Sequence, residues 1–583
     1  MSMKTIGNLM IIGLTGKAGS GFDTDVTNIF ETLGFSIIRS DDAVDAVWKI
    51  PEVLVEVADV FGREKIFDNA LDSDPRNWVR KRGVLGELVS SDVCKQDRLN
   101  DMLQPYISTF IYKRIKELKE ERIDRIVLIS SGLARGHLFL FCQYTWYIDR
   151  EEFKRREELL NFYKFRGFDL DYVTAKVNRT MRMQCDVKKP SEFNYDVVIK
   201  HPEDLGRLKE IIVFNLEPIM EKQNHPTVTA EQKHVFRAYK RRGQFTRSLL
   251  SLSQFTDLPI RIEEIDSLDK KKEKIQPSLV ACAEECAKLC NSNLDFNQEK
   301  RFLEYSPGEG KIQGEYNIVL PLNTSISPLI QTVLPFSLLG DNHVKFTLNG
   351  CTELSHSAPV NYFIYVFFPL MRRFGAKLDL KVLSRGFFDK GFGKVLVTID
   401  QIDCLERLNF TTKGECKKIV LSRNSIGFQS GQDEKVIKEI QNFIRSLGFL
   451  GEFEVKLYKD ENSAIKSFSM SVALETEHSL LGADIACDDA CSLLNEQKAI
   501  QELKQRTKLI LLTEAALDPF CCDQMLLYLA IAGGSITIPL NANLDHFYTQ
   551  LNLINSIKKQ MFNIERHGNI LRIDSEPLEF NNE

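Results

Sequence analysis

The sequence contains no apolar run long enough to cross a bilayer. Its longest apolar runs, residues 137–147 and 362–371, fall well short of the ~20 residues that a transmembrane helix needs. The apolar stretch after Asn8 is about five residues long, too short for the hydrophobic region of a secretory signal. We therefore expect neither a signal peptide nor a membrane partner.

The cysteines form no disulfide framework and no C-x-x-C pair. Thirteen cysteines are scattered over 583 residues. Cys282, Cys286 and Cys290 recur every fourth residue, which puts them on one stripe of a helix, and we interpret this stripe as core rather than as a metal site. No metal ligands are predicted, and a reduced, cytoplasmic location is the simplest expectation.

Neither sign of charge dominates the chain. It has 76 Lys and Arg against 81 Asp and Glu, with a net charge of −5, which excludes a globally basic nucleic-acid coat but not a local basic patch. Prolines are few (18) and 43% of the residues are apolar, as in an ordered globular protein. A chain of this length is expected to form about two to four domains.

In the first part of the chain, short apolar strands alternate with amphipathic helices. The strand candidates are MIIGLTG, FSIIRSD, RIVLISSG, YTWYID and YDVVIKH. This alternation predicts a doubly wound α/β domain with a parallel sheet over residues 1–216. Residues 217–234 are polar, contain two prolines and lack periodicity, so we interpret them as a linker.

From residue 235 onward, strands come in pairs, such as KFTLNG, KLDLKVLS and KVLVTIDQ. This pattern predicts mixed βαββ units over residues 235–404 and 506–583. Residues 405–505 are interpreted as a small inserted α/β domain. Its expected elements are a helix at 434–447, strands at 452–458 and 467–475, and a helical stretch at 488–504.

A glycine-rich turn follows the first strand. Residues 11–24, IIGLTGKAGSGFDT, begin like a phosphate-binding loop, whose backbone N–H groups cradle a nucleotide's phosphates. A working loop of this type continues G-K-[S/T], but here Phe22 and Asp23 occupy those two positions. The phosphate-binding ammonium and the Mg²⁺-binding hydroxyl are both absent. The candidate nucleotide-binding positions are Gly16, Gly19 and Gly21.

Several further segments give the first part a resemblance to the dephospho-coenzyme A kinase family. They are LGFSIIRSDDAV (33–44), FGREKIFDNALD (61–72), VLGELVSSD (84–92) and FNYDVVIK (193–200). The resemblance implies a P-loop kinase fold and puts Asp41 at the family's aspartate that faces the reacting hydroxyl. Without the lysine, kinase activity is not expected and Asp41 is vestigial. A structural or docking module is the main interpretation, and binding of a nucleotide or coenzyme A without transfer is an alternative.

The second part resembles the RNA 3′-terminal phosphate cyclase family over residues 236–573. The segments that carry the resemblance include GQFTRSLLSLSQFTDLPIRIEEI (243–265), LIQTVLPFSLL (329–339), NGCTELSHSAPVNYF (349–363) and DQMLLYLAIAGG (523–534). The resemblance implies a domain of βαβαββ units that uses ATP with Mg²⁺ or Mn²⁺. In this family a histidine accepts AMP, which then activates an RNA 3′-phosphate for cyclisation.

The same resemblance implies a set of site residues. His546, in the run H-x-x-T, matches the family's nucleophile, a role that suits a neutral imidazole. Asp523 and Gln524 match an Asp-Gln pair near the adenylate, and Pro359 matches a proline of the adenine pocket.

The family's glycine-rich signature is altered in this chain. G-E-G-G-G-Q-I-L-R becomes YKRRGQFTR at residues 239–247, so that a basic residue near Lys240 replaces a glutamate. The altered segment gains cations, with Phe236, Tyr239 and Phe245 interleaved among them. Such a mixture either binds single-stranded RNA by phosphate pairing and stacking or forms a solvated loop. The candidate RNA-binding residues are Arg237, Lys240, Arg241, Arg242 and Arg247.

These observations support two main hypotheses about function. The retained His546, Asp523 and Gln524 favour an ATP-dependent enzyme that adenylates or cyclises RNA 3′ ends. The lost groups at Phe22 and Lys240 favour a pseudoenzyme, an inactive scaffold that binds RNA or ribonucleoprotein in RNA processing or ribosome biogenesis. Both hypotheses predict RNA 3′ ends or ribonucleoprotein as partners, with protein partners bound through the kinase-like domain.

Overall fold

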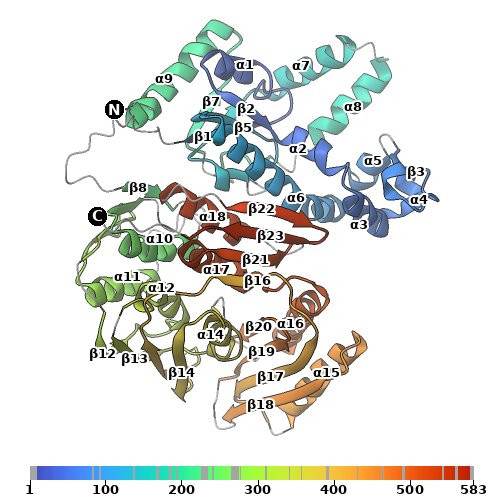
Figure 1. Cartoon of the computed structure of the whole chain (residues 1–583). Coiled ribbons are helices and arrows are strands. Elements are labelled where there is room, and N and C mark those ends of the chain that lie inside the picture. The colour runs from blue at the N-terminus through green and yellow to red at the C-terminus, as the bar shows by residue number, and fades with distance from the viewer. Residues whose placement is uncertain are drawn as a thin grey trace. The chain divides into compact units, whose positions relative to one another are not determined.

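The computed structural model (Figure 1) describes most of the chain as two compact units, divided between Thr229 and Ala230, and each unit is described by itself. The described residues are 9–81, 84–90, 93–134, 138–165, 170–182, 187–191, 193, 195–224, 234–238, 242–263, 265, 275, 277–308, 312–340, 342–355, 357–388, 393–429, 431–460, 463, 465–488, 493–540, 544–557 and 562–577.

A five-stranded parallel sheet forms the centre of the first unit, in the order β2-β5-β1-β6-β7. The strands are β1 (Met10–Gly16), β2 (Ser36–Arg39), β5 (Arg125–Ile129), β6 (Tyr144–Asp149) and β7 (Val197–Lys200). The first strand in sequence lies in the middle, and β1 is buried along its whole length, as expected of a strand covered on both faces. This confirms the predicted doubly wound α/β fold.

Helices connect these strands. They are α1 (Asp25–Thr32), α2 (Ser40–Val47), α3 (Pro51–Phe61), α4 (Arg63–Ile66), α5 (Val84–Ser90), α6 (Val93–Glu120), α7 (Glu152–Phe165), α8 (Leu170–Arg182) and α9 (Leu205–Asn224). The short strands β3 (Phe67–Asp68) and β4 (Val79–Arg80) pair with each other between α4 and α5. The glycine-rich loop therefore joins the carboxyl end of β1 to α1.

The predicted linker begins too early, because α9 continues through Pro218 to Asn224. Leu208, Ile212, Leu216 and Ile219 follow one another at helical spacing and are buried in the core of the first unit. Their burial outweighs the single backbone hydrogen bond that a proline removes from a helix. Glu217 and Pro218 are exposed on this helix, whereas Ile219 faces the core.

The second unit contains three copies of one βαβαββ arrangement, which confirms the predicted class of unit. In each copy the first two strands are parallel and the last two are antiparallel, and the order across the sheet is first, second, fourth, third. The three sheets are β10-β11-β9-β8, β12-β13-β15-β14 and β16-β21-β23-β22. The repeat is one of topology, since no short exact repeat is visible in the sequence.

The elements of the three copies follow in chain order. The first has β8 (His234–Arg237), α10 (Arg242–Thr256), β9 (Ile260–Glu263), α11 (Pro277–Cys290), β10 (Asn293–Asn297) and β11 (Phe302–Ser306). The second has β12 (Gly314–Val319), α12 (Ser327–Ser337), β13 (His343–Gly350), α13 (Val360–Tyr362), a π-helix (Phe363–Phe367), α14 (Phe368–Arg372), β14 (Lys377–Ser384) and β15 (Gly393–Asp400). The third has β16 (Leu408–Phe410), α17 (Pro519–Ala532), β21 (Gly534–Pro539), α18 (Asp545–Ile557), β22 (Asn563–His567) and β23 (Ile570–Ser575).

A separate sheet, β18-β17-β19-β20, interrupts the third copy. Its elements are β17 (Cys416–Ile426), α15 (Gln432–Ser446), β18 (Glu452–Asp460), β19 (Ser467–Thr476), β20 (Leu480–Cys487) and α16 (Leu493–Leu512). The bounds of the insertion differ from the predicted 405–505. β16 pairs with β21 of the third copy, and α16 continues to Leu512. A three-residue strand is too short to show a period in sequence.

The cysteine stripe lies in the core, on α11. Cys282, Cys286 and Cys290 are buried. Burial raises the pKa of Cys282 to about 11 and that of Cys290 to about 12, so these thiols stay protonated and unreactive at neutral pH.

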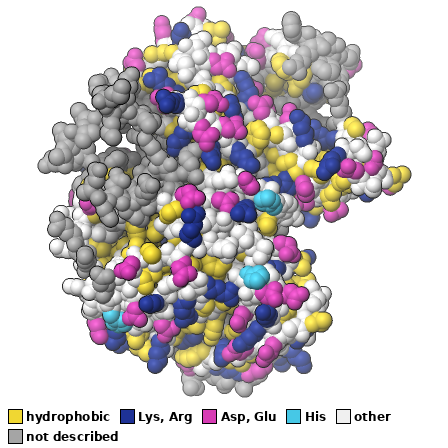
Figure 2. All heavy atoms as spheres, viewed as in Figure 1, with side chains coloured by type: hydrophobic (Ala, Val, Ile, Leu, Met, Phe, Trp, Pro, Cys, Tyr) yellow, Lys and Arg dark blue, Asp and Glu magenta, His cyan; other side chains and the backbone are white. Residues whose placement is uncertain are grey.

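On the face of the molecule shown in Figure 2, Lys and Arg side chains are interspersed with Asp and Glu side chains.

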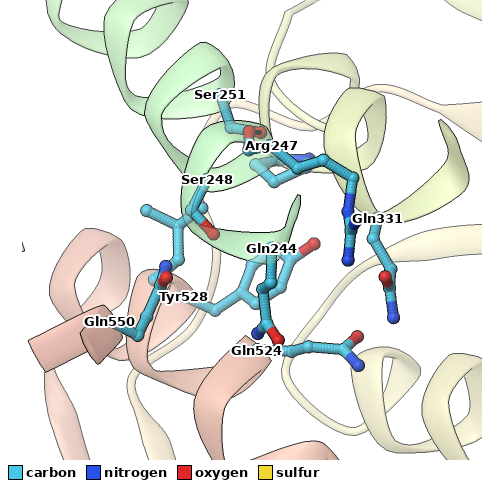
Figure 3. A pocket seen from close by; sticks show the side chains of 10 residues that line it. Gln244, Arg247, Ser248, Ser251, Gln331, Gln524, Tyr528 and Gln550 are labelled. Carbon is cyan, nitrogen blue, oxygen red and sulfur yellow. Dashed lines mark hydrogen bonds between the residues drawn. The ribbon is translucent and has the colours of Figure 1, made fainter. Parts of the chain in front are cut away.

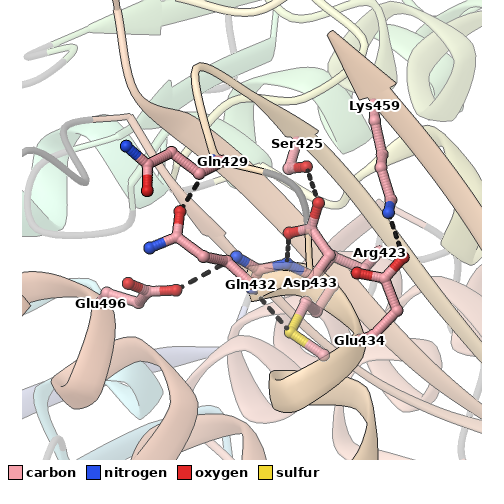
Figure 4. Close-up of polar contacts among 9 residues, drawn as sticks. Arg423, Ser425, Gln429, Gln432, Asp433, Glu434, Lys459 and Glu496 are labelled. Atoms are coloured by element: carbon pink, nitrogen blue, oxygen red, sulfur yellow. Dashed lines mark hydrogen bonds and ion pairs between the residues drawn. The ribbon is translucent and has the colours of Figure 1, made fainter. Parts of the chain in front are cut away.

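A buried arginine holds the inserted sheet to its helices (Figure 4). Arg423 of β17 is fully buried and pairs with Asp433 of α15 and, at 3.1 Å, with Glu496 of α16. Phe428 and Phe468 stack against its guanidinium at 4.9 and 4.4 Å. Removing one member of a buried ion pair leaves an uncompensated charge in a medium of low dielectric.

We expect Arg423→Met to lower the free energy of unfolding of the insertion by about 3–5 kcal/mol, because Asp433 would keep a buried charge without a partner. The matched control is Lys459→Met, which breaks the more exposed pair of Lys459 with Glu434 and should cost less than about 1 kcal/mol. Urea unfolding followed by circular dichroism measures both. Equal losses in the two variants would contradict the assigned role of Arg423.

Candidate functional site

A small pocket lies where four helices of the second unit meet (Figure 3). The side chains that line it come from one face each of α10, α12, α17 and α18. On α10 their spacing of three and four residues follows the helical turn. The lining residues are Gln244, Arg247, Ser248, Ser251, Gln331, Pro335, Gln524, Leu527, Tyr528 and Gln550.

The lining is polar but nearly neutral. Four of its side chains are glutamine carboxamides, two are serine hydroxyls, and Arg247 is the one charged group among the ten lining residues. Carboxamides both donate and accept hydrogen bonds, and a guanidinium pairs with phosphate oxygens. The cavity is small, about 30 Å³, which holds about two water molecules. A larger ligand would enter only if side chains such as Arg247 and Gln331 moved aside.

Asp523 is the buried acid beside this pocket. Gln244 donates a hydrogen bond of 2.5 Å to Oδ2 of Asp523, which joins α10 to α17. The other oxygen, Oδ1, is buried and has no hydrogen-bond partner among the described residues. Burial raises the pKa of Asp523 to about 7, although hydrogen bonds from Gln244 and from the backbone of Gln524, and the charge of Arg247, oppose this shift. Of the two carboxyl oxygens, Oδ1 is thus the open acceptor.

The structure places His546 in the first turn of α18, where it is half-buried. Gln550, which lines the pocket, follows it by four residues, so both side chains project from the same face of the helix. Thr549, the other member of the H-x-x-T run, is buried. The sequence-predicted His546, Gln524 and Asp523 are therefore brought to one region by two neighbouring helices.

Pro359 is buried at the start of α13 and is not among the residues that line the pocket. The carbonyl oxygen of its neighbour Ala358 accepts a hydrogen bond of 2.6 Å from Ser327 Oγ, at the beginning of α12. Gln331 follows one turn later on that helix. The Pro359 turn is thus connected to the pocket through α12.

The predicted RNA-binding cluster is described only in part. Lys240 and Arg241 lie outside the described residues, as do the side chains of Arg237 and Arg242. Arg247 points into the pocket, which differs from an exposed cluster beside a linker. Phe245 is buried in the core, so the structure contradicts its expected place among the stacking aromatics.

In the first unit, the glycine-rich loop is packed against other parts of the same unit. Gly19 and Gly21 have positive φ values of 78° and 83°. A Cβ atom would lie 2.5 Å from the carbonyl oxygen of Arg155 at Gly19, and 2.8 Å from Nε2 of His201 at Gly21. At Gly16 it would lie 2.8 Å from the carbonyl oxygen of Ile148. These glycines are thus required by close packing within the protein itself.

Two carbonyl oxygens of the loop accept hydrogen bonds from nearby backbone N–H groups. Ser20 N donates to Lys17 O at 2.9 Å, and Val26 N donates to Gly21 O at 3.0 Å. Partial burial lowers the pKa of Lys17, and the nearby cations Lys189 and Arg155 add to this shift. The loop therefore keeps positive charge around it, although not at the position of the missing lysine.

Phe22 packs beneath the loop and does not fill it. Its side chain is buried in the core with Leu14, Val26 and Ile148. Asp23 and Asp41 are both exposed. The pKa of Asp41 is raised by desolvation of its carboxyl and then by the negative charge of Asp23. Residue 22 is thus part of the core, and Asp23 adds a negative charge near Asp41.

The described part of the chain contains no group of three or more His, Cys, Asp or Glu side chains that could hold a metal ion. None of its helices is both long enough and apolar enough to span a membrane.

Comparison with known proteins identifies both units. The sequence model of the RNA 3′-terminal phosphate cyclase family matches residues 240–564, more than half of the chain, and the chain belongs to this family. The dephospho-CoA kinase model matches residues 10–152, so the first unit contains a dephospho-CoA kinase domain. The predicted fusion of the two domains is confirmed.

The second unit is similar to curated RNA 3′-terminal phosphate cyclases. RNA 3′-terminal phosphate cyclase of Pyrobaculum neutrophilum is 22% identical over 328 residues, which cover 56% of this chain and 92% of the relative. The cyclase of Pyrococcus furiosus is 27% identical over 300 residues, covering 51% and 84%. Among solved structures, shikimate kinase from Aquifex aeolicus has a TM-score of 0.17 at 14% identity and covers 36% of this chain and 99% of its own.

We expect Phe22→Lys to destabilise the first unit by about 3–5 kcal/mol without creating a nucleotide site, because the ammonium would be buried in the core. Phe22→Leu, which stays apolar, should cost less. The tryptophans, at positions 48, 78 and 146, all lie in the first unit, so urea unfolding followed by their fluorescence reports on it. Tight binding of a fluorescent ATP analogue by the lysine variant would contradict this expectation.

The raised pKa of Asp523 predicts a pH dependence of stability. The pKa of Asp523 is about 7 in the folded state and about 4 in the unfolded state. Between about pH 4 and pH 7, Asp523 is therefore still protonated in the folded protein but already ionised in the unfolded chain. The free energy of unfolding should therefore fall as the pH rises from about 4 to 7 and level off above that. Asp523→Asn should reduce this fall, whereas Asp379→Asn, at an exposed position, should not. Equal slopes in urea titrations of wild type and Asp523→Asn would refute the assignment.

Proposed function

We propose that the second unit binds ATP and an RNA 3′ end at this pocket and modifies the RNA end through an adenylated His546. The observation that carries the proposal is the convergence of Gln244, Gln331, Gln524 and Gln550 on one pocket, next to the open acceptor of Asp523. These residues come from four helices in three separate stretches of the sequence, and the family match covers all four.

The chemistry follows from the family. A ring nitrogen of His546 attacks the α-phosphorus of ATP, a P–N bond forms, and the bond to the β-phosphate breaks with release of pyrophosphate. The RNA 3′-phosphate then takes AMP from the histidine. Attack by the adjacent 2′-hydroxyl closes a 2′,3′-cyclic phosphate and releases AMP. Arg247 is placed to pair with a phosphate oxygen in these steps.

For the first unit we propose a structural or docking role rather than phosphoryl transfer. Its support is Phe22 in the core in place of a lysine, at a position where a cation normally stabilises the charge of the transition state. The second candidate for the whole protein is an RNA- or ribonucleoprotein-binding scaffold without turnover. The small size of the pocket, about 30 Å³, favours this candidate, because ATP would enter only if lining side chains moved aside.

Incubation of the protein with α-³²P-ATP and Mg²⁺ or Mn²⁺, followed by a denaturing gel, separates the two candidates. We expect an acid-labile, alkali-stable label on wild type and on His567→Asn, which alters an exposed histidine. His546→Asn should lose at least 100-fold of the label, because no other imidazole replaces the nucleophile (a factor of this size is about 2.7 kcal/mol).

Absence of label from folded wild type would exclude the histidyl-adenylate. Binding of 3′-phosphorylated RNA by that same unlabelled protein, weakened in Arg247→Ala, would then establish the scaffold. An unchanged label in His546→Asn would show that another residue accepts AMP.

A further inference from the structure

Three buried oxygen atoms lie in one row across the inserted sheet. Ser422 of β17 is paired with Ser471 of β19, and Ser471 is paired with Asp484 of β20. Directly opposed residues of antiparallel strands project from the same face of a sheet. Ser422 Oγ, Ser471 Oγ and Asp484 Oδ1 are all buried, and none has a hydrogen-bond partner among the described residues.

The next row of the same sheet is fully paired. Asn424 Nδ2 donates to Ser469 Oγ at 3.1 Å, and Ser469 Oγ donates to the carboxylate of Glu353. The carboxylate of Glu353 is in turn paired with Arg385 at 2.5 Å. The polar side chains of this row thus have hydrogen-bond partners within the protein. The three oxygen atoms of the neighbouring row have none among the described residues. Buried polar atoms are almost always paired, so the second row requires a partner of another kind.

The charges around Asp484 show what that partner must supply. Asp518 and Glu502 lie near Asp484 and make its surroundings more negative. The guanidinium of Arg506 donates to the backbone carbonyl oxygen of Asp484 and to Glu502 rather than to the Asp484 carboxylate. An ionised Asp484 is therefore a buried carboxylate without an ion-pair partner among the described residues.

We propose that Ser422, Ser471 and Asp484 bind one monovalent metal cation, Na⁺ or K⁺. Two hydroxyl oxygens and one carboxylate are hard ligands that together carry a single negative charge, which one such ion neutralises. Ca²⁺ takes six to eight oxygen ligands and Mg²⁺ keeps a strict octahedral shell, usually with more than one carboxylate or several waters. A row with one carboxylate suits neither.

The position of this row gives the cation a structural consequence. On β20, Gly482 lies two residues before Asp484, and its backbone N–H donates at 2.8 Å to Asp518, which caps the N-terminus of α17. The same helix carries Asp523 and Gln524. The cation would thus stabilise the strand against which α17 is anchored. This proposal does not depend on the proposed enzymatic function.

Thermal unfolding of the full-length protein at pH 8 tests the proposal, with NaCl, KCl and choline chloride compared at equal concentration. We expect Na⁺ or K⁺ to raise the Tm of the transition that includes the insertion by about 2–4 °C over choline, which is too large for the row. Asp484→Asn and Ser471→Ala should lose this difference. Asp379→Asn, at an exposed position, should keep it.

Crystals soaked in RbCl provide a second measurement that does not require Asp484→Asn to fold. An anomalous peak between Ser422, Ser471 and Asp484 in wild type would support a site for K⁺, which Rb⁺ replaces, and absence of this peak together with equal Tm values in NaCl and choline chloride would overturn the proposal. Equal Tm values in all three salts would show that water or a proton on Asp484 satisfies the row. A salt difference that persists in both variants would place the cation elsewhere. Either of these results would overturn the proposal.

Discussion

The second unit is organised around a helix that is buried on nearly all of its surface. Eleven of the fourteen residues of α17 are buried, and it packs against α18 and β21. A helix in this position cannot satisfy its first N–H groups with water. Asp518 does so instead, accepting hydrogen bonds from Phe520 N and Cys521 N, and it also accepts from Tyr362 Oη and Gly482 N. Burial raises the pKa of this cap to about 6.

The electrostatics of the candidate site depend on the same burial. Asp523 lies one turn beyond the cap, on a helix whose other buried residues are mostly apolar, so its carboxyl is desolvated. Its hydrogen bond to Gln244 draws α10 toward α17, and this contact positions the polar face of α10. A more exposed helix would leave Asp523 as an ordinary ionised carboxylate. The proposed cation row borders the other end of the same arrangement, through β20 and Asp518.

The two units differ in how they have changed relative to their families. In the first unit, Phe22 lies in the core at the position where a working phosphate-binding loop has a lysine, so a lysine placed there is expected to destabilise the unit. In the second unit, the polar groups on four helices still converge, although the glycine-rich signature before Gln244 has changed. A fold can persist after its catalytic groups are lost, because the core and the site use different residues. This difference is the reason for proposing turnover only in the second unit.

Much of the fold could be predicted from local patterns. The alternation of strands and helices gave the doubly wound sheet, and paired strands gave the mixed units. The insertion's expected helix at 434–447 and strands at 452–458 and 467–475 correspond to α15, β18 and β19. β17 and β20 were missed. Both are mostly buried and lack a strict alternation of apolar and polar residues, because serines and Arg423 occupy interior positions of β17 and Gly482 and Asp484 occupy interior positions of β20.

The sequence by itself determined the two families, the class of each fold and the candidate residues His546, Asp523 and Gln524, because these depend on residue types in a linear order. Only the tertiary structure decided which side chains share a pocket. Gln331 and Gln550 are 219 positions apart, and neither carries a signal that distinguishes it from a surface glutamine. It also decided that Phe22 lies in the core and that Ser422, Ser471 and Asp484 form one row. These are results of packing and strand register, which bring together residues that no local pattern connects.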